Sequence, residues 1–357
     1  MSDNNSKKSN AGKRRVKKWQ KILIAVLSVL LIAAGSAYGF VMHKLNQIER
    51  DPDLDLSALK TVEVPDYRNI LLLGIDTRNM DVADGSRSDA IMIASINESS
   101  KEVRVTSIYR DTLLKMGDWD SYEKVTHAHA YGGVEMTLQT LNQALDLDMT
   151  EYVEFNFKAV ADAVDAVGGI TVDVKEREIE QLNKYTIESA NSIGKTDYHL
   201  VEEPGEQVLD GAQAVSYGRI RKGVGDDYKR TERMRIVMEL LLEKVKQMSV
   251  SEINDLLSIV LPQIKTNLTN TQILDLMADV NKYEVTDSIG FPFQKYGTYI
   301  DGVSVVVPLD WEADVSRWHE KMFGQTGYEV SPQAKEISDH IKAEMLDEAR
   351  PDEDYEY

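Results

Sequence analysis

The sequence predicts an α/β protein: an α-β-α sandwich with a central mixed sheet, preceded by a single N-terminal transmembrane helix. Three observations support this prediction. Strand-like and helix-like patterns alternate through about 67–330, residues 22–42 carry no charge, and a basic segment, 1–21, stands directly before that run. Alternating strands and helices are typical of a sheet covered by helices on both faces.

The alternating body begins with strands. Residues 69–75, 90–96 and 103–108 are apolar and bounded by polar turns, as expected for buried strands. Apolar residues at helical spacing predict a helix over 134–145, and a strand follows over 152–155. The other predicted elements are a helix over 157–167 closed by Gly168-Gly169, a strand over 170–174, helices over 231–248, 253–264 and 271–283, a strand over 303–307 and a helix over 311–323.

Charge divides the chain at the uncharged run. Residues 1–21 hold eight lysines and arginines against one aspartate, whereas the whole chain has a formal net charge of −19. A helix over residues 22–42 would be about 32 Å long, which matches a bilayer core of about 30 Å. The basic flank predicts a cytoplasmic N-terminus and an extracytoplasmic remainder, hence a single-pass protein of the cell membrane. A cleaved signal peptide is the alternative, because Gly35-Ser36-Ala37 places small residues near the end of the run.

Beyond the anchor, the sequence predicts three segments. A spacer over 43–66 contains several aspartates and prolines, a catalytic domain occupies 67–330, and an acidic tail covers 331–357. The first part of the tail is predicted as a short helix, and its last eight residues as a solvated, disordered end.

Composition excludes several classes of protein. The chain has no cysteine, which removes disulfides, thiol catalysis and cysteine-ligated zinc or iron–sulfur centres. Its net charge of −19 argues against a bulk nucleic-acid binder, whose affinity depends on neutralising phosphates. No nucleic-acid partner is therefore expected.

Charged residues gather where the predicted strands end. Asp76 follows the first strand, and Arg87 and Asp89 stand just before the second. Arg110 and Asp111 end the third. Ligands of open α/β sheets bind outside the carboxyl ends of strands, where guanidinium groups can hold phosphate oxygens and carboxylates a hard divalent cation. These residues therefore predict a site for a multiply anionic ligand.

A second charged group lies further along the chain: Arg219, Arg221, Asp226, Asp227, Arg230, Arg233 and Arg235. For any single Arg–Asp pair, the alternative is a surface ion pair worth about 0–1 kcal/mol. Recurrence at successive strand ends favours a binding site, although these residues alone leave the substrate unnamed.

His127-Ala128-His129 is a weak metal signal. On a strand the two imidazoles would point the same way, but no third ligand is evident, so a partly buried or substrate-side histidine is expected rather than zinc. Gly132-Gly133 and Gly168-Gly169 match no phosphate-binding fingerprint and predict turns. The sequence contains no nucleophile elbow, P-loop or dinucleotide signature.

Seven segments in order resemble the LytR-CpsA-Psr family: LLLGIDTR (71–78), RSDAIMIASIN (87–97), SIYRDT (107–112), KVTHAHAYGG (124–133), AVGGITVDV (166–174), LDGAQAVSYGRIRKG (209–223) and DDYKRTERMR (226–235). The resemblance covers about 65–250. It implies a membrane-anchored extracytoplasmic phosphotransferase of Gram-positive bacteria. Such enzymes move an undecaprenyl-(pyro)phosphate-linked glycopolymer, a wall teichoic acid or capsule-like chain, onto the muramic acid C6 hydroxyl of peptidoglycan.

The resemblance also implies roles for individual residues. Asp76 and Asp89 match the ligands of Mg²⁺ (or Mn²⁺), and Asp89 is also a candidate for assisting deprotonation of the acceptor. Asp111 and Asp227 are expected to orient arginines, and Asp111 joins Asp89 and Arg110 as the catalytic candidates. The arginines expected to bind the pyrophosphate are Arg87, Arg110, Arg219, Arg221, Arg230 and Arg233.

Three positions depart from the family pattern. Tyr109 stands where Pro is common, Lys229 where Gly is common, and Met234 where Gln is common. The first is expected to affect the aim of Arg110, and the others the choice of donor polymer. A prenyl chain needs an apolar channel, for which residues 134–145 and 157–167 are candidates, although they also suit an ordinary core.

Two other functions stay open on the sequence. A polyprenyl-pyrophosphate hydrolase would use the same arginines with water as the acceptor. A non-enzymatic lipid-phosphate or glycan-binding envelope factor would keep the arginines but would not need Asp89, so the presence of Asp89 favours catalysis. A transcriptional regulator is not expected, because the predicted topology leaves only residues 1–21 inside the cell.

Overall fold

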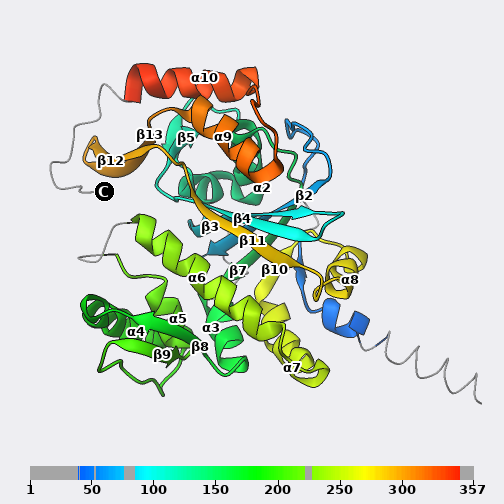
Figure 1. Cartoon of the computed structure of the whole chain (residues 1–357), viewed down its shortest axis with the longest axis vertical. Helices are drawn as coiled ribbons and strands as arrows, with labels where there is room; N and C mark the ends of the chain where they lie inside the picture. The colour runs from blue at the N-terminus through cyan, green and yellow to red at the C-terminus, as the bar shows by residue number, and fades with distance from the viewer. Residues whose placement is uncertain (1–38, 40, 52–53, 76–84, 222–226, 346–357) are drawn as a thin grey trace, which may run out of the picture. The chain divides into compact units, whose positions relative to one another are not determined.

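The structure is a computed structural model that describes residues 39, 41–51, 54–75, 85–221 and 227–345 (Figure 1). It divides into two units, 1–47 and 48–357. In the first unit, residues 41–45 are helical. Within the described ranges, no helix has both the length and the apolar character to cross a membrane. The predicted anchor, 22–42, lies outside those ranges except at residues 39, 41 and 42, so it stays a prediction.

The second unit is built on a seven-stranded sheet, and this confirms the predicted mixed α/β class. Its order is β1 (Glu49–Arg50), β10 (Ile264–Thr266), β7 (Glu151–Asn156), β2 (Tyr67–Ile75), β3 (Ser88–Asn97), β4 (Glu102–Ile108) and β11 (Glu284–Phe291). Strand β3 runs antiparallel to β2 and β4, whereas β2 pairs with β7 and β4 with β11 in parallel. The carboxyl ends of β2, β4, β7 and β11 therefore lie at the same edge as the start of β3.

Alternating side chains divide the core between the two faces of the sheet. Leu71 and Leu73 of β2 face one apolar cluster, while Leu72 packs against the other. The first cluster is covered by α2 (Thr126–Leu145), α9 (Trp311–Phe323) and α10 (Pro332–His340). The second is covered by α3 (Phe157–Ala166), α4 (Ile179–Ile193), α5 (Gly211–Tyr217) and α6 (Asp227–Val245), as Figure 1 shows on the opposite side of the sheet.

The smaller elements are three two-stranded ladders and several short helices. The ladders pair β5 (Leu113–Lys115) with β6 (Tyr122–Lys124), β8 (Ile170–Val174) with β9 (Gly205–Leu209), and β12 (Lys295–Ile300) with β13 (Val303–Pro308). The short helices are η2 (Glu176–Glu178), α7 (Val250–Val260), η3 (Leu261–Gln263), α8 (Asn270–Ala278) and η4 (Ile341–Met345).

The folded unit extends beyond both predicted domain boundaries, 67 and 330. Strand β1, from the predicted spacer, pairs with β10 in the main sheet. Helix α10, from the predicted acidic tail, buries Ala334 and Ile337 in the core. The tail is therefore helical at its start, as predicted, but that helix also contributes apolar packing.

Helix α9 is fixed by two buried tryptophans. The indole N–H of Trp311 donates to the carbonyl of Ala144 on α2 (2.7 Å), and that of Trp318 donates to the Thr106 hydroxyl on β4 (2.9 Å). Each ring is fully buried and its indole N–H is hydrogen-bonded. The helix therefore gains apolar burial without leaving a buried donor unpaired. This docking covers the face of the sheet that carries α2.

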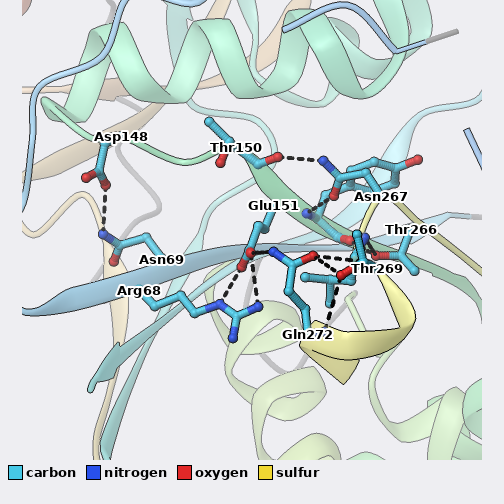
Figure 2. A network of polar contacts seen from close by, with 11 residues as sticks. Arg68, Asn69, Asp148, Thr150, Glu151, Thr266, Asn267, Thr269 and Gln272 are labelled. Atoms are coloured by element: carbon cyan, nitrogen blue, oxygen red, sulfur yellow. Dashed lines mark hydrogen bonds and ion pairs between the residues drawn. The ribbon is translucent and has the colours of Figure 1, made fainter. Parts of the chain in front are cut away.

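At the amino ends of β2 and β7, a polar network joins the late segment 264–278 to the sheet (Figure 2). The Arg68 guanidinium donates from Nε and Nη2 to the two carboxylate oxygens of Glu151, at 2.6 and 3.0 Å. Gln272 on α8 donates to the same carboxylate (2.5 Å), and Asn267 bridges the backbone of Thr150 and Tyr152. This bidentate pair and its neighbours stabilise the end of the sheet where β2 and β7 begin. The charged strand-end residues lie at the opposite end, where these strands finish.

Candidate functional site

The site centres on the Asp89 carboxylate, at the second residue of β3. Arg110 follows the end of β4, and its Nη1 lies 2.5 Å from Asp89 Oδ1. The last β3–β4 pair is Ile91 with Ile108, so the same register places Asp89 directly opposite Arg110 two residues beyond it. Both side chains are largely buried, with 13% and 15% of their surface exposed. Asp89 and Arg110, which the sequence predicted to lie together at the strand ends, are thus in contact.

Arg230 binds the same carboxylate from α6. Its Nη2 lies 2.7 Å from Asp89 Oδ2 and 3.3 Å from the Asp89 carbonyl oxygen, and only 4% of its side chain is exposed. Burial alone would raise the pKa of Asp89, but the positive charges of Arg230, Arg110 and Arg221 outweigh it and hold that pKa below its ordinary value. The centre therefore combines an ionised carboxylate with two guanidinium groups in contact with it, and the charge of a third, Arg221, also lowers the pKa of Asp89.

Asp111 lies on the other side of Arg110. Its Oδ1 is 3.8 Å from Arg110 Nε and 3.4 Å from the ammonium nitrogen of Lys124 at the end of β6. Arg110 is thus flanked by two carboxylates, Asp89 and Asp111, which limit the directions its guanidinium can take. Lys124 was not singled out in the sequence analysis, although it begins the KVTHAHAYGG segment.

Two other arginines predicted for the pyrophosphate, Arg219 and Arg87, form no ion pair with Asp89 in the described part of the chain. Arg219 contacts α4, where Nη1 donates to the Ser189 hydroxyl (2.9 Å) and the guanidinium lies over the Tyr185 ring. It lines a cleft of about 570 Å³ between α3, α4 and α5 that also includes Lys158. Arg87 is exposed beside Asp89 in the chain. The structure thus joins Arg110 and Arg230 to Asp89, whereas the Arg219 side chain contacts α4.

Arg233 is engaged in a buried ion pair. Its Nη2 and Nε donate to Glu178 Oε1 at 2.8 and 3.1 Å, and Nη1 donates to the Ile220 carbonyl at 3.3 Å. Because Ile220 stands between Arg219 and Arg221, this pair fixes the segment that carries both arginines. Sequence reasoning missed Glu178, since an isolated acid gives no signal of burial.

Two predicted aspartates lie outside the described parts of the structure: Asp76, and the side chain of Asp227 at the start of α6. In the described residues, no three His, Asp or Glu side chains are grouped closely enough to hold a metal. Each oxygen of Asp89 accepts an arginine hydrogen bond, and a carboxylate has about four lone-pair sites. Mg²⁺ is commonly held by one or two carboxylates together with phosphates and water, so Asp89 suits such an ion as part of a phosphate complex.

The two histidines of the 127–129 segment lie on a helix, not on the strand considered in the sequence analysis. Helix α2 begins at Thr126, so His127 and His129 point in different directions. His129 is buried with its Nδ1 2.8 Å from the Ser86 carbonyl, and His127 pairs with Glu123. Gly132 and Gly133 interrupt α2 with non-helical backbone angles, and Gly133 has a φ of 61°.

The two candidate channel helices lie on opposite faces of the sheet, so they do not line one channel together. Side chains of 134–145 pack in the first cluster and those of 157–166 in the second. A small cavity of about 10 Å³ instead opens beside Asp89, lined by Met92 and Ile108 of the sheet and Met234 of α6. Its lining combines Asp89, Arg230 and Thr231 with apolar side chains, and it includes Met234, one of the three positions that depart from the family pattern.

Tyr109, another departure, packs where β4 leaves the sheet. Its ring makes an edge contact with Tyr228 on α6, with centroids 4.8 Å apart, and the Lys295 ammonium lies over both rings. Its backbone N–H still donates to the Phe291 carbonyl (3.0 Å), which a proline could not do. Tyr109 therefore extends the β4–β11 pairing by one bond just before Arg110.

These features define an α/β protein with arginines gathered around the Asp89 carboxylate, at the end of a mixed sheet where its parallel strands finish. The model of the LytR_cpsA_psr family matches residues 33–320, and the chain belongs to that family.

Named relatives and solved structures agree. TagT of Bacillus subtilis (strain 168), a polyisoprenyl-teichoic acid–peptidoglycan teichoic acid transferase, is 32% identical over 302 residues, which cover 80% of this chain and 90% of TagT. TagU of Bacillus mycoides (strain KBAB4), of the same transferase name, is 28% identical over 274 residues, covering 74% and 83%. The structure of TagT bound to LIIa-WTA superposes with a TM-score of 0.58 at 27% identity, covering 78% and 98%. TagT with bound octaprenyl pyrophosphate lipid gives 0.54 at 26% identity, covering 76% and 96%.

Proposed function

We propose that this protein is a phosphotransferase that moves a glycopolymer, of the wall teichoic acid or capsule-like kind, from an undecaprenyl (pyro)phosphate carrier to peptidoglycan. The observation that carries the proposal is the Asp89 carboxylate held between Arg110 and Arg230, with Arg221 close enough to lower its pKa. The names of TagT and TagU supply the donor and acceptor classes.

The arginines suit a pyrophosphate because guanidinium groups bind phosphate oxygens in pairs. In the transfer step, an acceptor hydroxyl attacks the polymer-linked phosphorus and a new O–P bond forms. The bond to the lipid phosphate breaks, and that phosphate leaves with the electron pair and takes up the hydroxyl proton. We assign to Arg110, Arg221 and Arg230 the stabilisation of the charge that develops on the leaving phosphate.

Asp89 is better suited to holding charge than to accepting a proton. Its pKa is lowered, and both oxygens already accept arginine bonds. A base with a depressed pKa is a weak one at neutral pH. We therefore assign Asp89 to orienting Arg110 and Arg230 and to binding Mg²⁺ (or Mn²⁺), with Asp76 as the proposed second ligand. When bound, the ion would supply additional positive charge to the phosphates.

The prenyl chain is proposed to enter the cavity beside Asp89, under α6. Two of its walls, Met92 and Met234, belong to the apolar cluster between the sheet and α6. At about 10 Å³ the cavity has room for about one water molecule, so entry of the chain requires these methionines to move aside, and methionine side chains adapt their shape readily. We further propose that residues 22–42 anchor the protein in the cell membrane with its catalytic domain outside, because the donor lies in the same bilayer.

The test is transfer by the full-length protein in detergent. It is incubated with a prenyl-pyrophosphate-linked glycopolymer, Mg²⁺ and nascent peptidoglycan, and compared with Arg110→Ala, Asp89→Ala and a control, Arg235→Ala. Arg235 lies on α6, and its contact with Glu239 is long, at 3.9 Å.

Three outcomes separate the candidate functions. Covalent transfer that is lost in Arg110→Ala and Asp89→Ala but kept in Arg235→Ala supports the ligase. Release of lipid phosphate without polymer on the glycan means a hydrolase. Tight lipid binding without turnover for any acceptor means a binding factor.

A further inference from the structure

The first turn of α2 contacts the backbone of both segments that meet at the site. The Thr126 N–H donates to the Arg110 carbonyl (3.0 Å), and its hydroxyl donates to the Ser88 carbonyl (2.7 Å). Thr126 is 2% exposed, so both bonds are shielded from water. One residue thus links the backbone next to Asp89 to the backbone of Arg110 itself.

This link stands where the sheet no longer joins the two strands. The β3–β4 pairs end at Ile91 and Ile108, and Asp89 and Arg110 lie two residues further along the same register. Ladder hydrogen bonds would normally set the spacing of two facing residues. Beyond the end of the ladder, Thr126 provides a bridge between the two strands at the level of the ion pair.

His129 supports the same segment one turn later. Its Nδ1 lies 2.8 Å from the Ser86 carbonyl, which can only accept, so Nδ1 carries the proton. Its Nε2 faces the Glu154 carboxylate on β7 at 3.6 Å, and the two side chains are 2% and 1% exposed. Ser86 and Ser88 flank Arg87, so α2 holds both backbone carbonyls beside it.

We propose that Thr126 is a positioning residue that sets the distance between Asp89 and Arg110. His129 supports it by holding the backbone at Ser86, just before β3. Thr126 does not contact the reacting groups; it acts through the two backbone segments that carry them. A guanidinium and a carboxylate must lie in a narrow geometry to bind phosphate and cation together, and small displacements at such sites cost large factors. The 126–129 turn therefore belongs to the phosphate site.

The test compares Thr126→Val with Thr126→Ser. Valine keeps the shape and the backbone N–H but removes the hydroxyl, which leaves the Ser88 carbonyl without that bond, whereas serine keeps the hydroxyl. The readout is the affinity of the full chain for geranyl pyrophosphate with Mg²⁺, measured by calorimetry. We expect Thr126→Val to weaken binding about tenfold or more, and Thr126→Ser to stay within about twofold of the wild type.

The calorimetric stoichiometry separates positioning from folding. A merely destabilised variant would bind fewer equivalents at unchanged affinity, whereas a misplaced site binds one equivalent more weakly. Amide hydrogen exchange over residues 86–92 gives a second readout that needs no ligand, and it should rise in Thr126→Val alone. Equal affinity and equal exchange in Thr126→Val and the wild type would overturn the proposal.

His129 offers an independent pair of variants. The shorter side-chain amide introduced by His129→Asn can occupy the place of Nδ1 and donate to the Ser86 carbonyl, whereas the longer one introduced by His129→Gln reaches only toward Glu154. We expect exchange over 85–89 to rise more in the His129→Gln variant. Equal exchange in the two variants would contradict the role of His129.

The pyrophosphate probe rests on the proposed function, whereas hydrogen exchange does not. Failure of the wild type to bind geranyl pyrophosphate refutes that function, while the exchange results still test the positioning by Thr126 and His129.

Discussion

Arg230 of α6 binds Asp89 of β3 twice, through the carboxylate at 2.7 Å and the backbone carbonyl at 3.3 Å. These contacts attach the start of α6 to the first residues of β3 through the Arg230 side chain. The helix that closes over the site is therefore held by the same carboxylate that binds Arg110. Binding geometry and local stability are consequently coupled at Asp89.

This coupling predicts that Arg230→Met is strongly destabilising. Removing one partner of a buried ion pair leaves the other charge poorly compensated, at a cost of about 3–5 kcal/mol. The matched control is Arg235→Met on the same helix, whose contact with Glu239 is longer, at 3.9 Å, and has a partner that is 37% exposed, so it should cost less than Arg230→Met. Urea unfolding of both variants measures the difference. Equal losses would show that the Arg230–Asp89 contact does not hold α6.

Arg233 should affect stability more than ligand affinity. It is 4% exposed and bound to Glu178, so Arg233→Met is expected to lose about 3–5 kcal/mol of unfolding free energy. The double variant Arg233→Met with Glu178→Met should recover part of that loss, because no unpaired charge remains buried. If the folded fraction of Arg233→Met instead binds geranyl pyrophosphate at least tenfold more weakly than the wild type, Arg233 belongs to the pyrophosphate-binding arginines, as the family resemblance implied.

The acid stability of the protein should depend on Asp89. Its folded pKa lies below the unfolded value of about 3.9, so the ionised carboxylate stabilises the fold above that pH. That contribution is lost as the pH falls through the folded pKa. The difference in unfolding free energy between the wild type and Asp89→Asn should be constant above about pH 5 and shrink in more acidic buffer. If the difference in unfolding free energy instead grows as the pH falls, the pKa of Asp89 is raised in the folded protein, which contradicts this prediction.

Magnesium and pyrophosphate should bind cooperatively. Asp89 already faces two guanidinium groups, which repel a cation until phosphates neutralise them. We expect Mg²⁺ to bind at least about tenfold more tightly when geranyl pyrophosphate is present, and the reverse effect must be equal. Calorimetric titrations in both orders measure it. Tight Mg²⁺ binding to the ligand-free protein, unchanged by pyrophosphate, would contradict this prediction.

The sequence predicted the strands of the sheet well because their signals are local. Apolar runs bounded by turns located β2, β3, β4 and β7, and Gly168-Gly169 marked the end of α3, where Gly169 donates to the Val164 carbonyl. The helix predicted over 311–323 matches α9. Elements that depend on distant partners were missed: β10 lies at the end of a predicted helix over 253–264, and α4, β11 and β12 were not foreseen.

The candidate site was predictable only in part. Asp89 and Arg110 could be placed together because strand ends share an edge, and Arg230 was identified through the family resemblance. The face of each helix could not be inferred from spacing, so one channel was assigned to helices on opposite sides of the sheet. The burial of Arg233 depends on Glu178, 55 residues earlier in the chain, and Thr126 acts through backbone carbonyls that leave no residue pattern.

The most direct test is the position of the phosphates in a crystal structure of the protein with a prenyl pyrophosphate and Mg²⁺. We expect phosphate oxygens within about 3.2 Å of guanidinium nitrogens of Arg110 and Arg221, beside Asp89. Phosphates bound instead in the cleft of Arg219 and Lys158, with none beside Asp89, would contradict the assignment of the site.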